Sequence, residues 1–148
     1  MNISEVLDKL PYQSPFLFVD DLTDINENGV QGNYTFRSDS YFYQGHFKGF
    51  PVTPGVILTE CCAQIGLVCL GIFLLKDESF QETLGVAFTS SEMEYLLPVY
   101  PEEKVTVTAK KVYFRFNKLK CKVEMRNVSG KLVCKGTLAG MLNSFNNA

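Results

Sequence analysis

The residues from Pro54 to Leu75 form an apolar stretch of 22 residues in which Glu60 is the only charged side chain. Thr53 and Pro54 at its start are typical of a helix N-terminus, because a hydroxyl can cap free amides and proline lacks the donor that would stay unpaired there. We expect one helix that ends near Leu75, where polar residues follow. A helix that is apolar on every side has to be covered on every side, by lipid or by the protein itself.

A membrane span is the first alternative for this helix. Glu60 and Gln64 would then lie in the half of the hydrocarbon layer nearest the helix start, where an unpaired carboxylate costs roughly 2.5 kcal/mol or more. The rest of the chain alternates between apolar and polar residues, as strands do when one face covers a core. The pattern therefore favours a soluble fold, with no membrane span, in which a sheet buries the helix.

Apart from the long helix, we expect a short helix and several strands. Ser4 can cap a helix that ends before Pro11. The expected strands span residues 15–22, 30–37, 84–95, 104–116, 119–128 and 131–142, with turns at Asn28-Gly29 and Ser129-Gly130. No repeat or linker divides the chain. We therefore expect residues 1–148 to form a single α+β domain in which an antiparallel sheet of about six strands wraps around one helix.

The composition argues against several classes of function. The net charge of −2, from 14 basic and 16 acidic residues, provides no overall field that would attract nucleic acid. Five cysteines without a CxxC pair, together with a single histidine, give no convincing zinc-binding set, so we expect no metal. The cysteines lie in apolar segments, which is typical of reduced thiols, and the N-terminus carries no recognisable export signal. We expect a cytoplasmic protein.

The chain's one histidine, His46, lies in a loop rich in glycine and proline that precedes the long helix. A neutral imidazole can accept a proton near neutral pH. Gly45 beside it has no side chain, so a second molecule can approach closely. The loop is therefore a candidate for the position of a catalytic base.

The first turns of the helix supply the other candidate groups. Glu60 lies about 9 Å along the helix axis from Pro54, and Gln64 follows one turn later on the same face. A carboxyl group in such apolar surroundings should have a raised pKa, which suits it to act as an acid. The amide of Gly55 can bind a developing oxyanion, with the helix dipole behind it.

Each of these residues also has a purely structural interpretation. A lone histidine in an aromatic loop is often a hydrogen-bonded structural residue, and a buried carboxylate can simply be paired with a backbone donor or an arginine. Cys61 and Cys62 beside Glu60 raise the alternative of a cysteine nucleophile, but cysteines in apolar helices are usually inert. The occurrence of a base, an acid and an oxyanion donor around one helix start favours catalysis.

The loop and helix resemble the 3-hydroxyacyl-acyl carrier protein dehydratases of the hot-dog fold. The resemblance runs nearly end to end, through Leu10-Pro11, Pro15-Phe16-Leu17-Phe18-Val19-Asp20, Gly45-His46-Phe47, Gly49, Pro51-Val52, Pro54-Gly55-Val56, Glu60, Ala63-Gln64, Pro98-Val99 and Pro101-Glu102-Glu103. Several spaced motifs in the same order make it specific. The chain departs from the family pattern at Tyr12-Gln13-Ser14, which replaces a basic tripeptide containing histidine, and at Lys48, which replaces a common proline.

The resemblance implies a hydro-lyase that converts 3-hydroxyacyl-acyl carrier protein to the trans-2-enoyl form, in fatty acid biosynthesis or in a specialised polyene or polyketide-type pathway. It implies that His46 is the catalytic histidine and that Glu60, contributed by the partner subunit, is the catalytic acid. It also implies that Gly55 holds the thioester carbonyl, that Gln64 orients Glu60, and that the substrate site includes Phe47, Pro54 and Val56.

The same resemblance implies the partners. The substrate would arrive on the phosphopantetheine arm of acyl carrier protein, no further cofactor is expected, and the assembly would be a dimer or a trimer of dimers, with a heterodimer as a variant. Candidate docking cations for the acidic carrier are Arg37, Lys48, Lys110, Lys111 and Arg115. The 12 Phe and 7 Tyr residues either favour conjugated or aryl chains or simply fill a core.

Two alternatives stay open from the sequence. A hot-dog acyl thioesterase would bind a thioester at the same helix start, but it needs a carboxylate to activate water, so the loop around His46 argues against it. A catalytically silent subunit of a heteromeric dehydratase would have no chemical need for His46 or Glu60.

Overall fold

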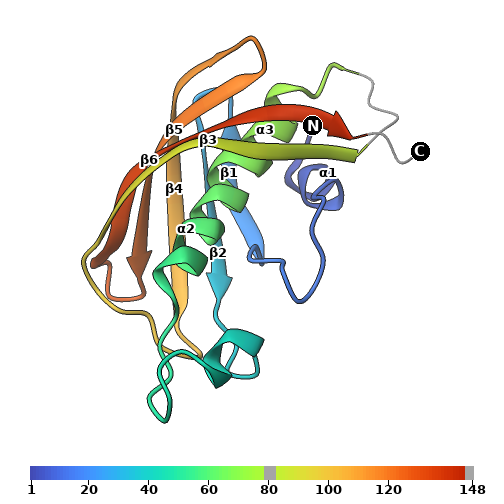
Figure 1. The fold of residues 1–148 in the computed structure, drawn as a ribbon. Coiled ribbons are helices and arrows are strands. Elements are labelled where there is room, and N and C mark those ends of the chain that lie inside the picture. The colour runs from blue at the N-terminus through green and yellow to red at the C-terminus, as the bar shows by residue number, and fades with distance from the viewer. Residues whose placement is uncertain (79–82, 146–148) are drawn as a thin grey trace.

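The computed structural model describes residues 1–78 and 83–145 (Figure 1). Within them, six antiparallel strands in the order β1-β2-β4-β5-β6-β3 curve around one long helix. The elements are α1 (Ile3–Asp8), β1 (Asp21–Asn26), β2 (Gly29–Thr35), a 3-10 turn (Tyr41–Gln44), the long helix, β3 (Thr83–Tyr95), β4 (Lys104–Arg115), β5 (Lys118–Asn127) and β6 (Leu132–Phe145). The predicted α+β class and the wrapped helix are confirmed. That the single domain extends over all of residues 1–148 stays a prediction.

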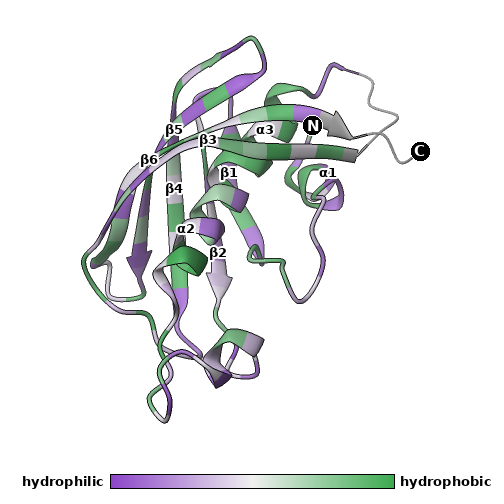
Figure 2. Ribbon diagram, viewed as in Figure 1, coloured by the Kyte–Doolittle hydropathy of each residue, from purple (hydrophilic) through white to green (hydrophobic). Residues whose placement is uncertain are grey.

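The long helix, called here the central helix, consists of α2 (Gly55–Ala63), a π-helical segment (Gln64–Cys69) and α3 (Leu70–Leu74). It is long and apolar enough to cross a membrane, but 78% of its apolar window is buried inside the protein. Figure 2 shows this largely hydrophobic helix lying on the concave side of the sheet. Burial by the sheet therefore accounts for the apolar composition without a membrane.

The prediction of one continuous α-helix over residues 54–75 needs two corrections. The helix begins at Gly55 rather than Pro54, and its middle is π-helical. π-Helical turns insert an extra residue and are frequent at functional sites. Here the π segment begins at Gln64, whose side chain is held by three hydrogen bonds to other parts of the chain.

Both predicted helix caps are wrong. Asn2, not Ser4, caps α1: its side chain accepts a hydrogen bond from the amide of Glu5, whose side chain reaches back to the Asn2 amide. The hydroxyl of Thr53 does not cap the central helix, because it hydrogen-bonds to the hydroxyl of Tyr43 at 2.5 Å. The bond between Thr53 and Tyr43 therefore anchors the loop that precedes the central helix and does not cap the helix.

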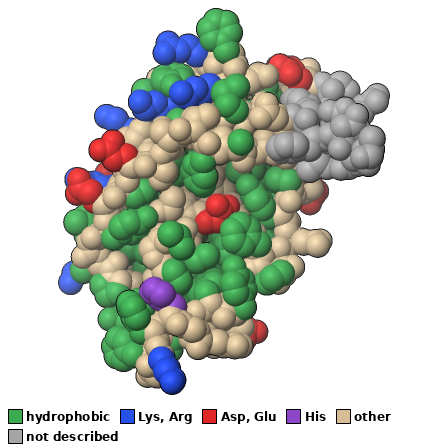
Figure 3. Space-filling view, viewed as in Figure 1, with side chains coloured by type: hydrophobic (Ala, Val, Ile, Leu, Met, Phe, Trp, Pro, Cys, Tyr) green, Lys and Arg blue, Asp and Glu red, His purple; other side chains and the backbone are tan. Residues whose placement is uncertain are grey.

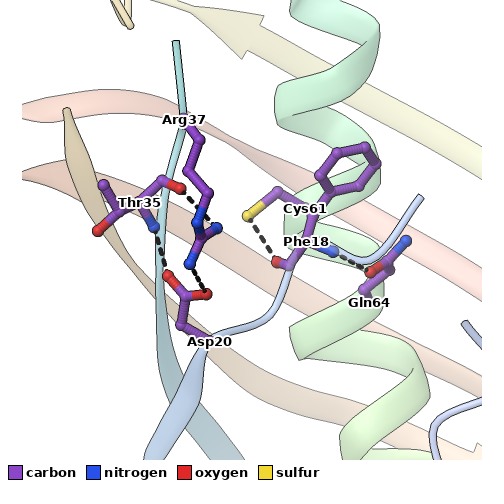
Figure 4. Close-up of polar contacts among 6 residues, drawn as sticks. All are labelled: Phe18, Asp20, Thr35, Arg37, Cys61 and Gln64. Carbon is purple, nitrogen blue, oxygen red and sulfur yellow. Dashed lines mark hydrogen bonds and ion pairs between the residues drawn. The ribbon is translucent and has the colours of Figure 1, made fainter. Parts of the chain in front are cut away.

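The predicted strand over residues 15–22 is wrong for most of its length, since β1 begins only at Asp21. The apolar residues before it lie against the central helix, and their backbone groups pair there. The amide of Phe18 donates to Gln64, and the carbonyl of Phe18 accepts from the Cys61 thiol (Figure 4). An apolar run can therefore resemble a strand although its hydrogen-bond partners lie on a helix.

The other strands lie within a few residues of their predicted limits. A turn joins each predicted pair of strands, but the first consists of Glu27 and Asn28 rather than Asn28 and Gly29, because Gly29 already pairs with Asn26. Gly130 has a φ of +78°, a conformation that glycine adopts readily in the turn between β5 and β6.

Gly66 lies where the central helix packs closely against strands β4 and β5. A Cβ atom at this position would lie 3.1 Å from the Ala109 Cβ on β4 and 3.1 Å from a Val123 methyl on β5. The absence of a side chain therefore lets helix and sheet pack in direct contact.

Replacing Gly66 by Val should lower the free energy of unfolding by about 1–3 kcal/mol, because two methyl groups must enter a filled core. Denaturant unfolding would measure the change. As a control, Val128→Ala at a position that is 79% exposed should change stability by less than about 0.5 kcal/mol. Equal unfolding midpoints for Gly66→Val and wild type would show that the core has room for the added side chain.

Candidate active site

His46 is held in one orientation by its own loop. Its Nδ1 lies 2.9 Å from the carbonyl oxygen of Val52, and the amide of Val52 donates back to the His46 carbonyl at 3.1 Å. A carbonyl oxygen can only accept, so Nδ1 carries the proton, and the neutral ring has its lone pair on Nε2. The ring stacks on Phe47 with centroids 4.3 Å apart. The imidazole is thus presented as a proton acceptor.

The loop around His46 is fixed at both ends. Thr53 bonds to Tyr43 through its hydroxyl, and its amide donates to the carbonyl of Val99 at 2.8 Å. Gly49 has a φ of +77° in the turn that follows Phe47, where the Phe50 amide bonds to the Phe47 carbonyl. These contacts tie the loop to the segment between β3 and β4 and hold His46 near the helix start.

Glu60 lies half-buried on the central helix. Gln64 donates a hydrogen bond from Nε2 to Glu60 Oε2 at 3.0 Å, so the expected contact between these residues is present. Burial raises the pKa of the Glu60 carboxyl, and the Gln64 hydrogen bond opposes this in part. A carboxyl group with a raised pKa can remain protonated closer to neutral pH.

Gln64 is fully buried, and its amide is in contact with three partners. Its Oε1 accepts from the Phe18 amide at 2.8 Å, while Nε2 donates to the Phe16 carbonyl at 3.1 Å and to Glu60. The Phe18 amide can only donate and the Phe16 carbonyl can only accept, which fixes the orientation of the Gln64 amide. Gln64 therefore holds the Glu60 carboxyl in a defined position relative to the N-terminal segment.

Gly55 and Val56 form the first turn of the central helix, directly after Pro54. The amides of Ile57 and Leu58 both donate to the Pro54 carbonyl. Within the part of the chain that the structure describes, the amides of Gly55 and Val56 have no acceptor, as is usual for a first turn. The helix dipole and these amides can bind a negatively charged oxygen.

Tyr95, at the end of β3, is a site residue that sequence reasoning missed. A Cβ on Gly55 would lie 3.2 Å from the Tyr95 ring, so the glycine is needed for this packing as well as for its amide. The Tyr95 hydroxyl is 2.5 Å from the Thr59 hydroxyl. No local sequence pattern indicated that Tyr95 belongs to the site, because its position there depends on a contact between β3 and the start of the central helix.

Tyr12 lies near Glu60 and was noted only as a departure from the family pattern. Burial and then the charge of Glu60 raise the pKa of Tyr12 to about 12, so its phenol stays neutral. It also lines a cavity of about 550 Å³ between the α1 end and the last turn of the central helix. A neutral phenol therefore lies near Glu60, at the start of the tripeptide Tyr12-Gln13-Ser14.

Cys61 and Cys62, the two cysteines beside Glu60, are unsuited to act as nucleophiles. All five are buried, and burial raises the pKa of Cys61 well above its ordinary value. A thiol of this kind stays protonated and packs as a small apolar group. Across residues 1–78 and 83–145, no three His, Cys, Asp or Glu side chains are grouped so that they could hold a metal ion.

His46 and Glu60 are not brought into direct contact within one chain. Among the described residues, no hydrogen bond or ion pair joins them. Val56 and Phe47 are 74% and 61% exposed, and Figure 3 shows apolar side chains over this end of the central helix and the loop below it. The surface beside the candidate site is therefore open and apolar.

Comparison with known proteins identifies the family. A FabA-like domain model matches residues 10–139. The 3-hydroxyacyl-[acyl-carrier-protein] dehydratase FabZ of Lactococcus lactis subsp. cremoris is 32% identical over 138 residues, covering 93% of this chain and 92% of that protein. The FabZ of Clostridium perfringens strain SM101 is 30% identical over 142 residues, covering 93% and 96%. The chain belongs to the 3-hydroxyacyl-[acyl-carrier-protein] dehydratase family.

Solved structures agree on the fold. The dehydratase heterocomplex ApeI:P from Xenorhabdus doucetiae matches with a TM-score of 0.78 at 13% identity, covering 96% of this chain and 91% of that one. A hypothetical thioesterase with coenzyme A from Streptococcus pneumoniae TIGR4 matches with a TM-score of 0.61 at 17% identity, covering 86% and 88%. The predicted hot-dog fold is confirmed.

Glu60→Gln should make the protein more stable at high pH. Because the folded pKa of Glu60 is raised, ionisation of the carboxyl opposes folding, and this penalty develops as the pH rises above the ordinary Glu value of 4.5. We expect Glu60→Gln to melt above wild type at pH 8 and the difference to shrink toward pH 4.

Thermal melts across this pH range would measure the effect, with Glu92→Gln, at an exposed position on β3, as the control for removing one negative charge. A difference that is independent of pH, or a destabilised Glu60→Gln at pH 8, would contradict the burial of the carboxyl.

Proposed function

We propose that this protein dehydrates 3-hydroxyacyl-acyl carrier protein to the trans-2-enoyl thioester. Membership of the dehydratase family supports the reaction. The observation that carries the proposal is the geometry of His46, whose Nδ1 is bonded to the Val52 carbonyl and whose Nε2 is left as the basic atom. A base of this kind, beside the free amides of a helix start, suits removal of a proton next to a thioester carbonyl.

In the first step, Nε2 of His46 takes the proton from C2 of the substrate. The electron pair of the broken C–H bond moves toward the thioester carbonyl, whose oxygen becomes negatively charged. The amide of Gly55 donates a hydrogen bond to this oxygen, and the dipole of the central helix stabilises the charge. Phe47, Pro54 and Val56 border the position of the thioester.

In the second step, the protonated Glu60 carboxyl donates its proton to the 3-hydroxyl group. The C3–O bond breaks, water leaves, and the electron pair of the enolate forms the double bond between C2 and C3. The raised pKa of Glu60 supports this role, because an acid has to hold its proton until the transition state. Gln64 acts as the positioning residue for the carboxyl.

We propose that Glu60 acts on a substrate held by His46 of a second copy of the chain. Strand β3 is an edge strand of the sheet, and its exposed apolar residues include Phe88 and Tyr95. Sheet edges and apolar patches are the surfaces that associate most readily. A symmetric dimer across this edge would contain two equivalent sites. A trimer of dimers would contain three such dimers, and a heterodimer would use the same edge with a different second chain.

The thioesterase and the silent subunit are less favoured alternatives. The thioesterase likeness is at 17% identity and concerns the fold alone. A silent subunit would not need the bonded His46 ring or the Gln64 contact to Glu60.

The pathway and the further partners stay predictions. The aromatic residues Phe18, Tyr34, Phe36, Phe42 and Tyr43 contact one another through their rings. Core packing therefore accounts for these five residues without a polyene substrate. We propose that no cofactor is needed beyond the phosphopantetheine arm of the carrier, and the cytoplasmic location is likewise a prediction.

Among the candidate docking cations for the carrier, Lys48 suits the role best, because it is exposed in the loop that presents His46. Arg37 is paired with Asp20 at 2.8 Å. Lys110, Lys111 and Arg115 lie toward the end of β4, away from this loop.

Incubation of the purified protein with 3-hydroxyacyl-acyl carrier protein should release water, which mass spectrometry of the carrier detects directly. His46→Ala and Glu60→Gln should each lower kcat/KM by at least about a hundredfold, since each removes a proton-transfer group. Gln44→Ala, at an exposed position before the loop, should retain activity. An inactive wild type, or an active His46→Ala, would overturn the assignment.

Mixing the two inactive variants should restore activity if each site uses two subunits. Random exchange of subunits gives half mixed dimers, each with one intact site of two, so we expect about a quarter of wild-type activity. No recovery after proven subunit exchange would place His46 and Glu60 of each site in the same chain.

A further inference from the structure

The β4–β5 hairpin carries an unusual concentration of positive charge. Residues 110–122 contain six of the chain's 14 Lys and Arg residues and none of its 16 Asp and Glu residues. The rest of the chain therefore has eight cations against 16 acids, a net charge of −8. Figure 3 shows the blue side chains gathered over this hairpin. An acidic protein thus presents one basic surface, which we call the basic hairpin (residues 110–122).

The tip of the basic hairpin exposes a large aromatic side chain. Arg115 pairs with Lys118, which leaves Phe116 and Asn117 as a two-residue turn with φ of +51° and +60°. Such turns favour Asn and Gly, and a bulky residue with positive φ is an outlier. Phe116 is nevertheless at the first turn position and is 93% exposed. Neither local backbone preference nor core packing explains a phenylalanine here.

The charges of the basic hairpin also oppose folding. Lys110 lies directly opposite Lys122, and Arg115 opposite Lys118, and like charges at directly opposed positions are destabilising. The Arg115 guanidinium lies over the Tyr113 ring at 4.3 Å. In residues 1–78 and 83–145, none of these cations forms an ion pair.

Acidic groups elsewhere do little to neutralise the basic hairpin. Glu27, in the turn between β1 and β2, lies near Lys111, whose charge contributes to lowering the pKa of Glu27. That carboxylate is already paired with Lys76 at 2.6 Å. The repulsion within the hairpin is therefore maintained rather than compensated, as expected for a surface that binds an anionic partner.

The basic hairpin lies too far from the His46 loop of its own chain to serve as the docking surface for a carrier protein that delivers substrate there. Lys104, at the start of β4, pairs with Thr35 beside that loop, whereas Arg115 is at the opposite end of the 12-residue strand. At about 3.3 Å per residue the two ends are about 36 Å apart. Figure 1 shows the hairpin and the loop at opposite ends of the molecule.

We propose that the basic hairpin binds the surface of an anionic phospholipid membrane, with the Phe116 ring inserted at the boundary between headgroups and acyl chains and the flanking cations on lipid phosphates. An exposed aromatic residue surrounded by Lys and Arg is the combination that binds reversibly at such an interface. A nucleic acid duplex or an acidic protein surface would use the cations, but neither offers the single Phe116 ring an apolar layer to enter. The proposal does not depend on the dehydratase reaction.

Co-sedimentation with vesicles tests the proposal directly. The full chain should bind vesicles of equimolar phosphatidylcholine and phosphatidylglycerol, bind little to phosphatidylcholine alone, and dissociate as salt is added. Phe116→Asn should weaken binding roughly tenfold, since the buried ring is lost. Each of Arg115→Gln and Lys118→Gln should weaken it about fivefold.

Matched variants separate a loss of vesicle binding from a loss of folding. Asn accepts positive φ, so Phe116→Asn should melt at or above the wild-type temperature. Val128→Asn, at an exposed apolar position in the β5–β6 turn, should bind vesicles as wild type does.

Failure of wild type to bind the anionic vesicles would overturn the proposal, and so would undiminished binding of Phe116→Asn. A further contrary result would be slower dehydration of the carrier-bound substrate by Phe116→Asn in lipid-free buffer, because the surface would then belong to the carrier protein. Vesicle binding without dehydratase activity would leave this proposal standing and overturn only the proposed reaction.

Discussion

The buried amide of Gln64 is the contact on which the candidate site depends. It joins the central helix to the backbone of Phe16 and Phe18, and it also binds the carboxyl of Glu60 on the same helix. In a fully buried position, loss of this amide would leave a backbone donor and a backbone acceptor unpaired, at about 1–3 kcal/mol each. The interaction that positions the acid is thus also the interaction that attaches the N-terminal segment to the core.

The reactive groups of the candidate site lie on rigid parts of the fold. The acid is on a helix that the sheet encloses, and the base is on a loop held by Tyr43, Thr53 and Val99. The helix start between them contributes amides without moving any side chain. A site built this way needs little reorganisation when charge develops on the substrate, which is the usual source of electrostatic catalysis.

The sequence predicted the parts of the fold that follow from local patterns. Strands β4 and β5 alternate between buried and more exposed residues along their own length, so their limits could be placed, and an apolar helix has to be covered by the rest of the chain. Residues 15–20 and the cap at Thr53 were mispredicted because their partners are distant in sequence: Gln64 for the first and Tyr43 for the second. His46, Glu60 and Gln64 were found because they occur in an ordered motif, whereas Tyr95 contributes through packing alone and left no such signal.

The division of roles between His46 and Glu60 is the central claim, and hydrogen exchange at C2 of the substrate tests it most directly. In D₂O, Glu60→Gln should exchange the C2 proton of a 3-hydroxyacyl-acyl carrier protein for deuterium without losing water, because His46 still removes that proton. His46→Ala should catalyse neither exchange nor dehydration. Exchange by His46→Ala, or its absence in Glu60→Gln, would contradict the assignment of His46 as the base and Glu60 as the acid.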